Sequence, residues 1–159
     1  MKSQTIALTK TLSLPLEILL WSTAFAIPLL LPGPQLVVGT LVNGLLFYSS
    51  LRLSGKKLII MAVLPSIATV GHGVLFGPFT LYMVYLLPFI WLGNWLLMDT
   101  FTKFQSILLA SITKAIILTL AVIILISLNV VPKMFLVPMS LVQLATAVTG
   151  GLLWMKLGS

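Results

Sequence analysis

The chain has 159 residues, of which 60% are hydrophobic and 7% are charged, and nine Lys and Arg against two Asp and Glu give a net charge of +7. A soluble domain carries about 25% charged residues, and a soluble fold of this length has no interior that could hide so much apolar surface, so lipid is the expected solvent. The absence of cysteine excludes disulfides, thiolate catalysis, Cys-ligated zinc and Cys-held iron–sulfur clusters.

Apolar stretches of span length predict an all-α, polytopic membrane protein, in which residues 1–159 form a single domain of six transmembrane helices at roughly 20 residues per span. The predicted spans, in chain order, are Leu14–Leu31, Leu36–Leu53, Leu58–Leu75, Thr80–Met98, a span within Gln105–Val131, and Met134–Met155. Ser13 fits the N-cap of the first span and Pro15 its first turn. Pro65 lies inside the third span.

The start of the chain also has features of a cleavable secretory signal. Lys2 and Lys10 precede an apolar stretch and the sequence Ala24-Phe25-Ala26, which fits a small-residue cleavage site. The apolar stretch nevertheless continues to Leu31, as a span does, and cleavage would leave five spans. We therefore favour a retained first span.

The positive residues predict the orientation, because cytoplasmic loops of membrane proteins collect Lys and Arg. With the N-terminus inside, the outer connections hold only Lys133, and Lys114 falls within the fifth span. The inner segments hold Lys2, Lys10, Arg52, Lys56, Lys57, Lys103 and Lys156. This distribution predicts a multi-pass protein of the plasma membrane with both termini in the cytoplasm. The topology also accounts for the excess of Lys and Arg, so we expect membrane lipid and not nucleic acid as a partner.

The first two outer connections are uncharged and rich in Gly and Pro. They are the segments 32–35 and 71–78, whereas the inner connections are charged. Irregular backbone persists at membrane depth only where protein or a watery cavity covers it. If the protein has a shaped pocket, we expect that pocket to open outward.

Polar residues inside spans are costly and need a reason. The residues that we expect to line an outward pocket for a small neutral or weakly charged molecule are Gln35, Asn43, Ser66, His72 and Asn94. Asn43 would lie roughly 10 Å below the outer edge. The alternative is that these groups, and Gln143 in the sixth span, only form hydrogen bonds between helices. The four tryptophans are expected at the interface or facing lipid.

Glu17 and Lys114 are the ionisable residues closest to the hydrocarbon. They could form an ion pair with each other, or Glu17 could carry protons. The favoured interpretation places Glu17 in the first turn of its helix, where the helix dipole stabilises an acid, and lets Lys114 extend its amine to the interface.

No enzymatic motif is present: the sequence has no H-E-x-x-H, no G-x-S-x-G, no Walker loop and no paired carboxylates. A single histidine without cysteine does not predict a transition-metal site. We therefore expect a protein that is not an enzyme and that uses neither a cofactor nor a metal.

Residues 34–94 together resemble the substrate-binding S components of energy-coupling-factor (ECF) transporters. The residues that carry the resemblance are Pro34, Gln35, Gly39, Val42, Asn43, Leu64, Pro65, Ser66, the segment from Gly71 to Pro78, Pro88, Phe89, Ile90, Gly93 and Asn94. The resemblance implies a bundle of six helices with cytoplasmic termini, and an outward pocket closed by the loops after the first and third spans. It also implies docking of the first span to a membrane coupling protein and two ATPase subunits.

Ser22 and Ala26 match the Ala-x-x-x-Ala docking pattern of that family, with Ser in place of the first Ala. The substrate does not carry over, since family members bind different vitamins and metal ions. The expected function is the capture of a vitamin-like or similar micronutrient from outside, as the substrate-binding subunit of an ATP-driven importer. The alternatives are a structural or anchoring subunit of a larger membrane complex, and a small stand-alone carrier or channel.

Overall fold

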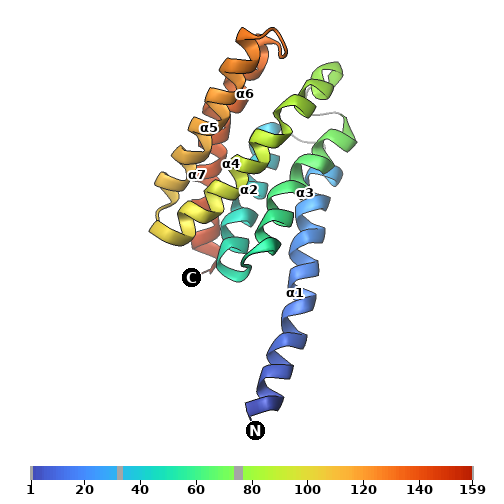
Figure 1. Cartoon of the computed structure of the whole chain (residues 1–159), viewed down its shortest axis with the longest axis vertical. Coiled ribbons are helices and arrows are strands. Elements are labelled where there is room, and N and C mark those ends of the chain that lie inside the picture. Colours follow the sequence, from blue (N-terminus) through green and yellow to red (C-terminus); the bar gives the residue numbers. More distant parts are fainter. Residues whose placement is uncertain (1, 32–33, 74–76, 159) are drawn as a thin grey trace.

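The structure is a computed structural model that describes the backbone of residues 2–31, 34–73 and 77–158, and their side chains apart from residues 2–15, 72, 77–78 and 157–158. All regular structure in these ranges is helical. The long helices are α1 (Lys2–Leu30), α2 (Gln35–Arg52), α3 (Lys56–His72), α4 (Met83–Phe104), α5 (Ile107–Ser127) and α7 (Leu141–Gly158). The short elements are η1 (Gly77–Tyr82), η2 (Lys133–Phe135) and α6 (Leu136–Met139). In Figure 1 the long helices alternate in direction, and both termini point to the same end.

Tight turns join the helices at the end that carries the termini. The turn between α2 and α3 uses Gly55 at φ 59°, and α4 ends at Gln105 with φ 52°. The left-handed conformation of Gln105 stops α4 within one residue, whereas α2 ends at Leu53 in an extended conformation and Gly55 precedes the first residue of α3. The hydroxyl of Ser106 then accepts a hydrogen bond from the Leu109 amide and caps the start of α5. Successive helices therefore run antiparallel to each other (Figure 1).

Three helical segments of the described chain are long and apolar enough to cross a membrane: Phe79–Phe104, Ile107–Ser127 and Lys133–Lys156. The shorter helical stretch Leu16–Leu30 is also apolar. Helix α3 has only 17 residues. Helix α2 has 18 residues, which include three strongly polar ones, Gln35, Asn43 and Arg52.

One predicted boundary is wrong. Ser13 is not an N-cap, because α1 begins at Lys2 and continues through Ser13 and Pro15. No Gly or Pro precedes Pro15 to interrupt the helix. The sixth predicted span, Met134–Met155, agrees with the helical segment Lys133–Lys156, but Ser140 interrupts its regular helix between α6 and α7. Pro138, two residues earlier, has no N–H to donate, which weakens a continuous helix at this point. The third helix ends at His72, and the predicted end at Leu75 lies outside the described residues.

The long helices pack most closely as three pairs, α1 with α3, α2 with α7, and α4 with α5. Contacts of α3 with α4, of α5 with α7 and of α2 with α4 join the pairs into one bundle. Helix α1 packs mainly on α3, and its N-terminal part extends beyond the other helices (Figure 1). The periphery of the bundle thus holds α1, and its centre holds α2 and α4.

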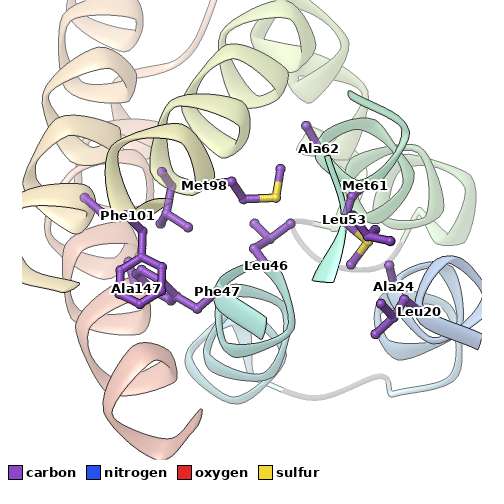
Figure 2. Packing of buried hydrophobic residues seen from close by; sticks show 12 residues of the cluster. Leu20, Ala24, Leu46, Phe47, Leu53, Met61, Ala62, Met98, Phe101 and Ala147 are labelled. Carbon is purple, nitrogen blue, oxygen red and sulfur yellow. The ribbon is translucent and has the colours of Figure 1, made fainter. Parts of the chain in front are cut away.

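Two apolar clusters hold the bundle together. The lower cluster, near the end with the termini, consists of Leu20, Ala24, Leu46, Phe47, Leu53, Met61, Ala62, Leu97, Met98, Phe101, Ala110 and Ala147. Figure 2 shows Leu46 close to Met98 and Met61. The Phe47 and Phe101 rings pack edge to face, with their centroids 4.9 Å apart. The upper cluster consists of Met83, Leu86, Ile90, Leu118, Val122, Val131, Phe135 and Met139. The space between the clusters contains polar side chains.

Candidate solute-binding pocket

A pocket with a volume of about 80 Å³ lies among α2, α3, α4, α5, α6 and α7. Its apolar wall includes Val38, Met83, Ile90 and Met139. Its polar lining consists of Gln35, Asn43, Ser66, Thr69, Asn94, Lys114 and Gln143. No carboxylate or imidazole is among the described lining residues, so the pocket presents amides, hydroxyls and one amine.

Four of the five residues predicted to bind a solute line this pocket: Gln35, Asn43, Ser66 and Asn94. They come from three different helices, and only the packing of α2, α3 and α4 brings them together. The fifth, His72, is the last residue of α3, and its side chain lies outside the described part of the chain. Of the loops expected to close the pocket, 32–35 and 71–78, residues 32–33 and 74–76 also lie outside the described ranges.

The floor of the pocket is a chain of hydrogen bonds across three helices. The Lys114 amine donates to Asn43 Oδ1 at 2.6 Å. Asn43 Nδ2 donates to Thr146 Oγ1 at 3.0 Å, and this hydroxyl donates to the Val142 carbonyl at 2.8 Å. Lys114, Asn43 and Thr146 are 3%, 1% and 1% exposed. A single polar chain therefore joins α5, α2 and α7 at the centre of the bundle.

Lys114 contradicts both interpretations drawn from the sequence. It is buried and does not extend to the interface. Its partner is not Glu17, which forms an ion pair with Lys57, while Asp99 pairs with Lys103 at 2.8 Å. Because the sequence contains only these two acidic residues, Lys114 is a buried amine without a carboxylate partner in the described part of the chain.

A sequence signal for the position of Lys114 does exist. Its neighbours on the buried face of α5 are the small residues Ala110, Ser111 and Ala115. The opposite face presents large exposed side chains such as Ile112 and Ile116. Small residues mark the face of a membrane helix that approaches other helices, and this face carries the lysine inward.

Asn94 lines the same pocket as Lys114. Its Nδ2 donates to the Ala62 carbonyl at 2.9 Å, and its buried Oδ1 has no hydrogen-bond donor among the described residues. The preceding residue, Gly93, faces the lysine, since a Cβ at this position would lie 3.4 Å from Lys114 Cγ, an ordinary van der Waals contact. The wall formed by α4 therefore contains a buried amide oxygen without a donor among the described residues.

Ser66 is already engaged in the bundle. Its hydroxyl accepts a hydrogen bond from Trp91 Nε1 at 2.7 Å and donates to the Val63 carbonyl at 2.8 Å. Trp91 thus joins α4 to α3, and its expected role as an interface or lipid-facing residue is wrong in this respect. Trp95 is 38% exposed, as the sequence predicted.

The pocket has a half-buried upper rim and a closed lower end. Gln35, whose Nε2 donates to the Pro138 carbonyl at 3.4 Å, and Gln143 are only half-buried. Asn43 lies eight residues after Gln35 on α2, which is about 12 Å along the helix axis. Below it, Leu46 and Leu97 of the lower cluster are fully buried. A solute would therefore enter from the end opposite the termini.

The predicted docking residues lie away from the pocket. Ser22 is exposed and Ala26 is half-buried on the peripheral helix α1. Ala24, on the inner side of α1, is fully buried in the lower cluster. The face with Ser22 and Ala26 is thus separate from the pocket lining.

Comparisons with known proteins give no relative: no family model, no curated protein and no solved structure matches this chain. The functional argument therefore depends on the pocket and on the arrangement of the helices.

Proposed function

We propose that this chain is a non-enzymatic membrane protein that captures a small solute from outside the cell, as the substrate-binding subunit of an ATP-driven importer of the ECF type. The observation that carries the proposal is the pocket, in which Gln35, Asn43, Ser66 and Asn94 meet Lys114. Isolated polar groups inside a bundle would only need pairwise partners. A shared cavity that holds an unpaired acceptor and a buried amine is typical of a binding site.

The proposal places all six long helices across the membrane, with both termini inside. The alternating helix directions support this arrangement, as do the three segments long and apolar enough to cross a membrane. The charges support the orientation, because Arg52, Lys56 and Lys103 lie at the end that carries the termini. The pocket rim then faces outward.

The size of the pocket limits the solute. A volume of about 80 Å³ takes roughly five to eight water-sized groups. Pockets for drug-sized ligands have volumes of about 300–1,000 Å³. With the helices in this arrangement, the proposed solute is a molecule of a few non-hydrogen atoms, which is smaller than a typical vitamin.

A partner is proposed because the sequence has no nucleotide-binding loop and an ATPase would have to be supplied by other subunits. The exposed face of α1 with Ser22 and Ala26 is the proposed contact with the coupling protein. Small side chains there allow another helix to approach closely.

Purification of the tagged chain from its native membranes tests the proposal. We expect a coupling subunit and ATPase subunits to co-purify, and mass spectrometry of the denatured sample to detect a small bound solute. Ser22→Trp should remove the partners, whereas the control Ile116→Trp, at a residue that is 51% exposed on α5, should retain them. A preparation that never contains such subunits or a solute would refute the proposal.

A structural or anchoring subunit is the second candidate. The observation that favours it is that Asn43, Trp91 and Asn94 all make hydrogen bonds between helices, as a scaffold without a ligand would. Gln35→Ala separates the two candidates, because Gln35 lies at the rim with one long hydrogen bond. A solute-binding subunit should lose solute affinity and keep its partners, whereas an anchoring subunit should show no change in affinity.

A stand-alone carrier would instead transport solute into liposomes without ATPase subunits.

A further inference from the structure

The most unusual group in the molecule is the amine at the floor of the pocket. Lys114 is 3% exposed, and its one hydrogen bond within the described structure goes to Asn43. An ammonium group has three donors, and burying one without a counter-charge is costly. Both acidic side chains of the sequence are bonded to other lysines. The protein itself therefore leaves this amine short of acceptors and of negative charge.

The wall of the pocket formed by α4 has the opposite need, a hydrogen-bond donor. Asn94 Oδ1 is a buried acceptor without a donor among the described residues. Gly93 brings this part of α4 against the Lys114 side chain, and both Asn94 and Lys114 line the same cavity. A solute that satisfies both groups needs an anionic oxygen for the amine and an N–H or O–H for the amide oxygen.

The number of positive charges selects the kind of anion. Lys114 is the sole cationic residue among the described residues that line the pocket, so it can neutralise one negative charge. A doubly charged phosphate or sulfate would keep one uncompensated charge in a low-dielectric site. The planar fork of arginine, which suits such groups, is also absent from the lining. A carboxylate satisfies both conditions.

We propose that the pocket binds a small monocarboxylate that bears a hydroxyl or amino group, with Lys114 on the carboxylate and Asn94 Oδ1 accepting from the donor. This inference rests on the proposed function, because it names the class of solute for the same pocket. An acid with a three-carbon chain and one hydroxyl group has six non-hydrogen atoms, which is compatible with a cavity of about 80 Å³.

The test uses the purified full-length chain in lipid nanodiscs and three probes of similar size: lactate, lactamide and propionate. Calorimetry should show binding of lactate, little or no binding of the neutral lactamide, and weaker binding of propionate, which lacks the hydroxyl. Lys114→Met should weaken lactate binding roughly thirtyfold or more, since it removes one partner of a buried charge pair. The control Lys103→Met, at an exposed pair with Asp99, should leave binding unchanged.

Asn94→Ala supplies a second measurement. It should remove the preference for lactate over propionate and leave the preference for lactate over lactamide. Equal binding of lactate and lactamide, or no carboxylate binding at millimolar concentration, would overturn the inference. The probes on the unmodified protein decide this even if Lys114→Met does not fold.

Failure of the inference remains separate from failure of the proposed function. Co-purification with ATPase and coupling subunits uses no probe. A protein that assembles with these subunits and binds a neutral solute would therefore refute the carboxylate site alone.

Discussion

At the scale of single residues, Asn43 connects three helices through one side-chain amide. It accepts from Lys114 and donates to Thr146, and all three residues are buried. Removing one of these partners lowers stability, because the buried polar group that remains has lost its hydrogen bond and keeps its full desolvation free energy.

Asn43→Leu should therefore lower the free energy of unfolding by about 3 kcal/mol, since it removes the partners of a buried amine and a buried hydroxyl. Denaturation in mixed detergent micelles, followed by circular dichroism, measures the change. The double variant Asn43→Leu with Lys114→Met should recover part of the loss, because the unpaired amine is then absent. Strict additivity of the two losses would contradict a direct coupling between these side chains.

The two ion pairs of the chain should differ in their contribution to stability. The Glu17 side chain is only 9% exposed in its pair with Lys57, whereas the side chains of Lys103 and Asp99 are 64% and 29% exposed. Lys57→Met leaves a buried carboxylate unpaired and should destabilise by about 1–3 kcal/mol. Lys103→Met should cost less than about 0.5 kcal/mol. Equal melting temperatures of the two variants would show that the Glu17 pair contributes no more to stability than the exposed pair.

The polar lining was predictable because amides stand out within apolar spans, and Gln35, Asn43 and Asn94 were found on this basis. Lys114 was placed wrongly because the rotation of α5 about its axis decides whether the lysine side chain points into the bundle or away from it. Packing sets that rotation, through small residues such as Ala110 and Ala115 that let α5 approach its neighbours. The partner of Glu17 was missed for a similar reason, since pairing with Lys57 requires α1 and α3 to be neighbours.

At the scale of the helices, α2 and α7 touch at the level of their backbones. A Cβ on Gly150 would collide with the Thr40 carbonyl oxygen and would lie 2.6 Å from the Gly44 nitrogen. These are backbone atoms, so they cannot yield unless the helices move apart.

Gly150→Ala should destabilise the bundle by about 1–3 kcal/mol, the usual cost of overpacking, and should also weaken solute binding because α2 and α7 both line the pocket. Gly71→Ala is the matched control, since nothing lies within 4 Å of a Cβ at that helical position. It should be neutral or stabilise slightly, given the low helix propensity of glycine. Thermal unfolding of both variants measures the difference, and equal melting temperatures would argue against backbone contact.

The positions of the helices followed well from hydropathy, and their ends followed where turn residues such as Gly55 mark them. The start expected at Ser13 did not, and the interruption at Ser140 was not predicted. A serine can cap a helix or lie inside one, and the neighbouring residues decide which occurs. At Ser13 nothing interrupts the preceding helix, whereas at Ser140 the chain folds back onto the upper cluster through Phe135 and Met139.

At the scale of the whole molecule, the natural absence of cysteine makes the proposed orientation directly testable. Ser54 is exposed in the turn between α2 and α3, and Leu128 is 64% exposed after α5. In intact cells a membrane-impermeant thiol reagent should label Leu128→Cys and not Ser54→Cys. Inside-out vesicles should give the reverse. Labelling of both positions from one side would contradict the alternation of six spans.

The division of the bundle into three helix pairs has a consequence for motion. Helices α2 and α7 are in backbone contact, and α4 packs closely on α5. The pocket lies between them, so it enlarges when the pairs shift relative to each other, without any helix unfolding. The hydrogen bond from Lys114 to Asn43 spans this boundary. A carboxylate bound to the two remaining donors of the amine would leave this tie in place, so that an occupied pocket would link the two pairs more firmly than an empty one.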